Sequence, residues 1–99
     1  MRHLIVVLLG LLMMAVPLAA QDGYRIKSGD VLSIEVLEDN TLNRTALVLP
    51  DGRISMPLAG TVRASGLTIE DLQSELAGRL APNFAATPTV FVSVNALSV

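Results

Sequence analysis

Three carboxylates, Glu35, Glu38 and Asp39, lie close together in the sequence and are the side chains best able to do chemistry. Two carboxyl groups on either side of a glycosidic bond can hydrolyse it, one as the acid and the other as the base or nucleophile. These three stand at the end of an apolar alternation and in a polar loop, a placement that gives such a pair no support. With Asn40 they also fall short of the longer run of oxygen ligands in a calcium loop. We interpret them as a solvated face.

Other catalytic groups are scarce in this sequence. His3 is the only histidine, and there is no cysteine. Residues 21–99 therefore contain neither an imidazole nor a thiol to act as general base, nucleophile or metal ligand. The stretch from Gly60 to Gly66 lacks the lysine and the helix opening of a phosphate loop. We expect a protein that is not an enzyme and that uses no cofactor and no metal.

The first 20 residues have the layout of a secretory signal peptide. A positive start with Arg2 precedes an apolar run from Leu4 to Val16, and small residues follow up to Ala20. A retained membrane anchor is the alternative, but the run is shorter than the roughly 20 residues of a spanning helix, and Pro17 breaks its end. We expect cleavage after Ala20, export to the periplasm or to the periplasmic face of the outer membrane, and one domain over residues 21–99.

The charge of residues 21–99 is mildly acidic. Arg2 is the only basic residue in the signal segment, so six basic and nine acidic side chains remain, a formal net charge of −3. Scattered basic residues in an acidic chain argue against a nucleic-acid partner. The lack of cysteine excludes disulfides and a lipid attached to cysteine. A domain of about 80 residues without such crosslinks is often marginally stable alone, which makes a homo-oligomer the expected state.

Two segments alternate apolar with polar residues and are predicted to be half-buried strands. The first covers residues 31–37 after the Ser28-Gly29-Asp30 turn, and the second covers residues 89–95 after Pro88. A third strand is expected over residues 46–49. Leu97 and Val99 would lie on the polar face of the second strand, where they need cover from a neighbouring subunit, a partner or a continuation of the chain.

A helix is predicted over about residues 68–81 from several independent signals. Thr68 can cap it with Asp71 in the first turn. Ile69, Leu72, Leu76 and Leu80 recur at helical spacing and form one apolar stripe. Glu75 and Arg79 are placed for an i,i+4 ion pair, and Pro82 stops the helix.

The segment from Leu49 to Leu67 connects the predicted strands to the helix. Turn signals stand at Asp51-Gly52, Ala59-Gly60 and Ser65-Gly66. Between the first two, apolar residues alternate with others, namely Ile54, Met56 and Leu58 with Arg53, Ser55 and Pro57. This pattern predicts strand, turn, strand, turn, strand. The whole chain therefore predicts an α+β fold, a small and mostly antiparallel β-sheet with one amphipathic helix packed on it.

In this order and at this spacing, the motifs resemble those of the outer-membrane polysaccharide export family, specifically its N-terminal export domain. The pattern runs from Tyr-x-Ile and a Gly-Asp turn, through Asp-Gly-x-Ile-x-Met-Pro-Leu-x-Gly, to Gly-Leu-Thr at the helix start and Pro-x-Val-x-Val-x-Val. It covers nearly all of residues 21–99. The motif residues that we single out as structural or as subunit contacts are Tyr24, Gly29, Asp30, Asp51, Gly52, Met56, Pro57, Leu58, Gly60, Gly66 and Leu67.

The resemblance implies a periplasmic domain of proteins that carry capsular polysaccharide or exopolysaccharide across the outer membrane. In that family the export domain forms a ring at the periplasmic end of a channel, facing the inner-membrane polymerisation and chain-length machinery. This sequence lacks the family's lipidated cysteine, its β-grasp repeats and its C-terminal amphipathic helix. We therefore expect a ring-forming or adaptor component that does not form the whole channel by itself.

Most of the motif residues also have an ordinary structural interpretation. Glycines supply positive φ in turns, and Asp51 and Asp30 hold the turns in which they lie. The functional alternative is that the surface from Met56 to Gly60 forms a subunit contact or part of a ring lumen. For Tyr24 the alternatives are a ring tucked under the sheet and an aromatic contact to a sugar.

Two other hypotheses remain open from the sequence. One is a small periplasmic carbohydrate-binding module that contacts sugar through Tyr24, Phe84 or Phe91. The other is a remnant or truncated copy of a longer exporter, which β-grasp coding sequence in the DNA downstream of Val99 would indicate.

Overall fold

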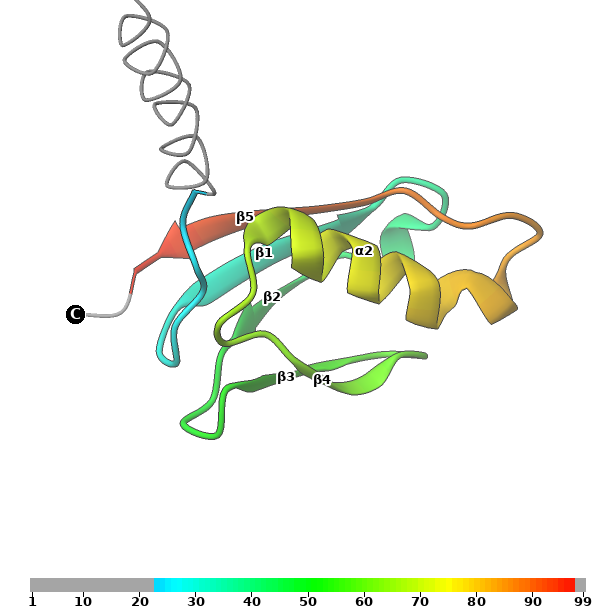
Figure 1. Cartoon of the computed structure of the whole chain (residues 1–99). Coiled ribbons are helices and arrows are strands. Elements are labelled where there is room, and N and C mark those ends of the chain that lie inside the picture. Colours follow the sequence, from blue (N-terminus) through cyan, green and yellow to red (C-terminus); the bar gives the residue numbers. More distant parts are fainter. Residues whose placement is uncertain (1–22, 98–99) are drawn as a thin grey trace, which may run out of the picture.

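Two small antiparallel sheets and one α-helix make up the fold of the computed structural model, which describes residues 23–97 (Figure 1). The predicted α+β fold is confirmed. The predicted signal peptide, its cleavage site at Ala20 and the predicted cover for Val99 lie outside the described residues.

The larger sheet has three strands, with β1 (Val31–Val36) in the middle. On one side it pairs with β2 (Arg44–Leu47) and on the other with β5 (Val90–Ala96), both antiparallel. The predictions for β1 and β5 are confirmed to within about two residues at each end, the usual uncertainty of an element boundary. The expected third strand begins at Arg44 rather than at residue 46, and its loop to β1 contains the short 3-10 helix η2 (Asn40–Leu42).

The helix α2 (Ile69–Leu80) has the N-cap and the i,i+4 ion pair that the sequence predicts. Thr68 is its N-cap, and its Oγ1 accepts a hydrogen bond of 3.1 Å from the backbone N of Asp71. Nε of Arg79 lies 2.7 Å from Oε2 of Glu75. After Leu80 the chain continues as a 3-10 turn, η3 (Ala81–Asn83), which contains Pro82. The helix therefore ends where the proline first removes a backbone donor.

A two-stranded hairpin forms the second sheet, from β3 (Arg53–Met56) and β4 (Gly60–Arg63). The sequence predicts that the first strand continues to Leu58, and this is wrong, because the strand ends at Met56 and Leu58 is 58% exposed. Pro57 has a fixed φ and no N–H for a ladder, so it opens the turn instead of extending the strand.

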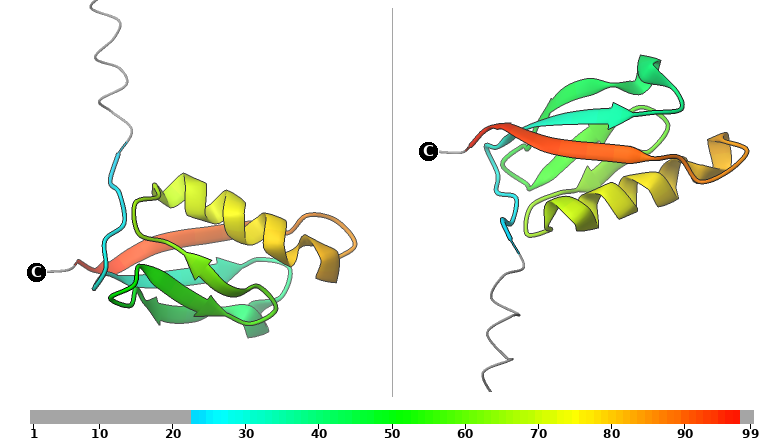
Figure 2. Two further views of the ribbon diagram at one scale, coloured as in Figure 1. Left: turned by 60° about the horizontal axis from the view of Figure 1, so that its bottom comes forward. Right: turned by 90° about the horizontal axis from the view of Figure 1, so that it is seen from above.

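One hydrophobic core lies between the three-stranded sheet, the helix and the hairpin (Figures 1 and 2). Each element contributes the apolar residues of a single face, as its periodicity requires. The fully buried side chains of the core include Leu32 and Ile34 of β1, Ile54 and Val62 of the hairpin, and Leu72, Leu76 and Leu80 of α2.

Candidate functional site

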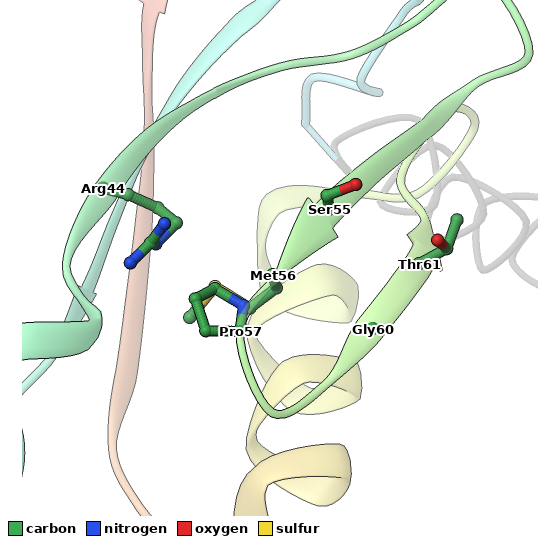
Figure 3. A pocket seen from close by; sticks show the side chains of 6 residues that line it. All are labelled: Arg44, Ser55, Met56, Pro57, Gly60 and Thr61. Atoms are coloured by element: carbon green, nitrogen blue, oxygen red, sulfur yellow. The ribbon is translucent and has the colours of Figure 1, made fainter.

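A groove separates β2 from β3, the two neighbouring strands that belong to different sheets. It has a volume of about 370 Å³ and is lined by Arg44 of β2 and by hairpin residues, as Figure 3 shows. A second hollow of about 300 Å³ continues along β2 and shares Arg44 and Ser55 with the first. Leu47 and Leu49, 52% and 44% exposed, line this second hollow. The groove is thus partly apolar, and Arg44 lines both of its parts.

The backbone of both strands presents polar groups to this groove. The backbone N of Val48 donates to the Asp30 carbonyl at 2.9 Å. The backbone N–H and C=O groups of the even-numbered residues of β2 therefore point toward β1, whereas those of Thr45 and Leu47 point toward the outer edge of the sheet. On β3, the amide of Ala64 donates to the Gly52 carbonyl at 2.8 Å, so that Ser55 faces away from β4. The two strands share no ladder. Apart from the Arg53 carbonyl, which accepts from the amide of Leu49 at 3.0 Å, their facing edges are therefore open to an incoming donor or acceptor.

The tip of the hairpin has an unusual backbone. The amide of Ala59 donates to the Met56 carbonyl at 3.2 Å, which closes a turn with Pro57 and Leu58 as its central residues. Leu58 has a φ of +70°. A turn with proline first and positive φ second usually carries glycine in the second place. In a non-glycine residue such a conformation costs about 1–2 kcal/mol. Leu58 therefore combines a strained backbone with an exposed apolar side chain.

The residues of the Met56–Gly60 motif differ in exposure, although Met56, Pro57 and Gly60 all line the groove. Met56 is 2% exposed and belongs to the core, whereas Pro57 is half-buried. Gly60 has a φ of +77° and nothing within 4 Å of the position of a Cβ atom. The exposed apolar contact offered by this motif is therefore Leu58.

Gly52 joins the beginning of the hairpin to its end. Its φ is +84°, and a Cβ atom there would lie 2.8 Å from the Cβ of Ser65. Its carbonyl accepts hydrogen bonds from the backbone N of Ala64 and Ser65 at 2.8 and 2.9 Å. Beside it, Oδ1 of Asp51 accepts from the backbone N of Arg53 at 3.1 Å. The Asp-Gly pair therefore holds the turn at which the hairpin begins.

Gly66 and Leu67 connect the N-terminal segment to the start of the helix. The amide of Gly66 donates to the Ile26 carbonyl at 2.8 Å, and the amide of Ile26 donates to the Leu67 carbonyl at 2.9 Å. Nη1 of Arg25 donates to the Gly66 carbonyl at 2.9 Å. Gly66 has a φ of +89°. These residues fix the chain that precedes β1 against the beginning of α2.

Asp30 is fully buried, and Tyr24 closes over it. Its Oδ2 accepts hydrogen bonds from the Tyr24 hydroxyl at 2.5 Å and from the backbone N of Lys27 at 2.9 Å. The hydrogen bond to Asp30, followed by desolvation and the Asp30 charge, raises the pKa of the Tyr24 hydroxyl from 10.0 to about 12. Nζ of Lys27 lies 5.9 Å from the centre of the Tyr24 ring. Gly29 lies beside them, its amide donating to the Val48 carbonyl at 2.7 Å.

The three carboxylates Glu35, Glu38 and Asp39 lie in different environments and do not form a common site. Oε1 of Glu38 accepts from the backbone N of Thr89 at 2.8 Å, and this bond lowers the pKa of Glu38. Asp39 caps η2 through Thr41. Glu35 is exposed on β1. Within residues 23–97 no group of three or more histidine, cysteine, aspartate or glutamate residues is placed to hold a metal ion.

A family model described as "polysaccharide biosynthesis/export protein" matches residues 18–95 of the chain. The chain belongs to this family. Its members are transport and export components and not a family of enzymes, and the chain therefore has a general role in polysaccharide export. The resemblance stated from the motifs is thereby confirmed.

The three aromatic residues of this export-family member do not come together. Tyr24 lies at the beginning of β1, next to Asp30, whereas Phe91 is opposite Glu35 near the other end of that strand. Phe84 is partly buried and packs against the core. The geometry therefore gives no support to an aromatic sugar site. Among the described helices, none combines the length and apolarity needed to cross a membrane.

Proposed function

We propose that this protein is an exported, self-associating component of polysaccharide export, which acts as a ring-forming or adaptor domain at the periplasmic side of the outer membrane. Its partners in this proposal are further copies of itself, the exported polysaccharide and the inner-membrane polymerisation and chain-length machinery. It contributes by assembly and positioning, without catalysing a reaction.

The observation that carries the self-association is Leu58. This leucine is 58% exposed at the end of the hairpin, and its φ is +70°. Strain of this kind persists only where the surrounding structure imposes it and is concentrated at functional sites. An apolar side chain held away from the domain in this way is suited to insert between copies, since burying a leucine contributes about 1.5–3 kcal/mol.

The open edge of β2 supports the same proposal. Exposed strand edges readily pair with another chain unless charge, proline or cover prevents it. Leu47, next to the edge groups of Thr45, is 52% exposed. A subunit that inserted Leu58 near this edge would bury apolar surface and saturate backbone groups together.

Sedimentation velocity over a series of protein concentrations tests this proposal. We expect the wild-type protein to associate, and the Leu58→Asn variant to associate at least about tenfold more weakly, because each 1.4 kcal/mol of lost contact changes the constant tenfold. Asparagine tolerates positive φ better than leucine, so the variant keeps the turn. Leu37→Asn is the matched control, because Leu37 is 61% exposed and does not line the groove. A wild-type protein that stays strictly monomeric at high concentration contradicts the ring-forming role.

A further inference from the structure

The solvent face of the hairpin carries two arginines directly opposite one another. Arg53 and Arg63 are partners in the β3–β4 register, and both are exposed. The amide of Leu49 donates to the Arg53 carbonyl at 3.0 Å, so this carbonyl faces away from β4. The 53/63 pair is therefore of the non-hydrogen-bonded kind, in which side chains come closest. Nη1 of Arg63 also extends toward β3, 3.1 Å from the position of a Cβ on Gly52.

Among residues 23–97, no acidic side chain forms an ion pair with either of these arginines. The side-chain ion pair within residues 23–97 joins Arg79 to Glu75 on α2, away from the hairpin. Asp51 is the only acidic residue from 44 to 67, and its Oδ1 accepts from the backbone N of Arg53. Like charges directly opposite each other destabilise an antiparallel pair. An anion that binds both guanidinium groups removes that repulsion.

The face of the hairpin that carries the arginine pair continues into the groove. Ser55 and Thr61 are the next partners along the hairpin on the same solvent face, and both line the groove. Arg44 lies across from them, as Figure 3 shows, and its Nε donates to the Leu42 carbonyl at 3.1 Å. One continuous surface thus presents three guanidinium groups and two hydroxyls, together with the open backbone edge of Ser55.

The chemistry of this surface matches an acidic glycan. Guanidinium groups bind carboxylates with two parallel hydrogen bonds, and hydroxyls and backbone groups bind sugar hydroxyls. The groove has no aromatic lining residue on which a nucleic-acid base could stack. Its volume of about 370 Å³ lies within the range of small-molecule sites, roughly 300–1,000 Å³.

We propose that Arg53, Arg63 and Arg44, with the adjoining groove, bind an acidic polysaccharide through its carboxylate groups. The choice of a polysaccharide rests on the export role of the family, whereas the preference for an acidic one comes from the arginines. The domain as a whole is acidic, with a formal charge of −3 over residues 21–99, so this surface is a local exception to its charge. Net charge alone does not predict it.

Calorimetric titration of the purified protein with oligogalacturonate tests this site, with a maltooligosaccharide of equal length as the neutral probe. We expect binding of the acidic probe only, weakened as salt is added because the contacts are exposed. Arg53→Gln/Arg63→Gln is expected to lower the association constant by about tenfold or more, since hydrogen bonds to charged groups are strong. Lys27→Gln/Arg79→Gln removes the same charge elsewhere and is expected to change it less than about twofold.

Three results overturn the site. They are equal losses in the two double variants, equal binding of the neutral probe, and tighter binding of vesicles of anionic phospholipid than of oligogalacturonate. Circular dichroism checks that the variants fold. If the Arg53→Gln/Arg63→Gln double variant does not fold, Arg44→Gln, which lies outside the hairpin, is used instead. It is expected to weaken the binding of oligogalacturonate, and unchanged binding overturns the site. Self-association is measured separately, so a monomer that binds oligogalacturonate refutes the ring-forming role alone.

Discussion

The helix-covered sheet and the β3–β4 hairpin owe their structures to different kinds of residue. The sheet and α2 rest on aliphatic side chains that are almost completely buried, among them Leu32, Ile34 and Leu76, each at most 1% exposed. The hairpin region also has an apolar face, but its shape depends on the backbone. Four of its residues have positive φ, namely Gly52, Leu58, Gly60 and Gly66.

This difference separates the scaffold of the domain from the surfaces to which we assign assembly and binding. Burial stabilises the sheet and helix, and the solvent-facing side of α2 carries an ordinary i,i+4 ion pair. The hairpin presents the arginine pair, the strained Leu58 and one wall of the groove. We therefore expect truncations in the scaffold to affect stability, and changes on the solvent face of the hairpin to affect assembly and binding.

The largest effect is expected from truncating the scaffold. Leu76 is completely buried on α2, so Leu76→Ala should lower the free energy of unfolding by about 2–5 kcal/mol through lost burial and a cavity. Urea denaturation followed by circular dichroism measures this. Leu47→Ala, at a side chain 52% exposed, is the control and should cost less than about 1 kcal/mol. Equal losses would show that the core does not lie where the structure places it.

A smaller effect is expected from adding one carbon at the root of the hairpin. Gly52→Ala combines an unfavourable φ with a Cβ only 2.8 Å from that of Ser65. It should lower the free energy of unfolding by about 1–3 kcal/mol. Gly60→Ala is the matched control, because its φ is similarly positive and nothing lies within 4 Å. Gly60→Ala should lower the free energy of unfolding only by the cost of the positive φ, about 1–2 kcal/mol. Thermal melting compares the two variants, and a more stable Gly52→Ala would refute the close approach.

The smallest effect concerns the titration of Tyr24, the only tyrosine in the chain. Its absorbance change should have a midpoint near pH 12 in the folded protein and near 10.0 in urea. Because the folded pKa is raised, this bond stabilises the fold fully below pH 10.0, and its contribution disappears as the pH rises toward 12. Asp30→Asn should move the folded midpoint down. A folded midpoint near 10 would mean that the hydroxyl does not bond to Asp30.

The sequence predicts the scaffold well because periodicity decides it. Alternation at Leu32, Ile34 and Val36 identifies β1, and the cap at Thr68 and the stop at Pro82 bound α2. Both signals are local, and the burial of one face follows from them. The family is also readable from the sequence, because its motif lies mainly in turns with fixed chemical requirements.

The hairpin is predicted less well because its features depend on geometry between distant residues. The glycine at 60 suggests the turn, but Pro57 begins it earlier and leaves Leu58 at the tip. The groove depends on where β2 and β3 separate, which no spacing in the sequence encodes. The burial of Asp30 under Tyr24 and the bond from Glu38 to Thr89 likewise arise from the tertiary fold.

The most direct test of the proposed role is the amount of surface polysaccharide in a strain that lacks this gene and is complemented with variants. Wild type and Leu37→Asn should restore the polymer, whereas Leu58→Asn, at equal protein level and equal stability, should not. Full restoration by Leu58→Asn, or an unchanged amount of polymer in the uncomplemented deletion strain, would contradict the role of the hairpin tip in export.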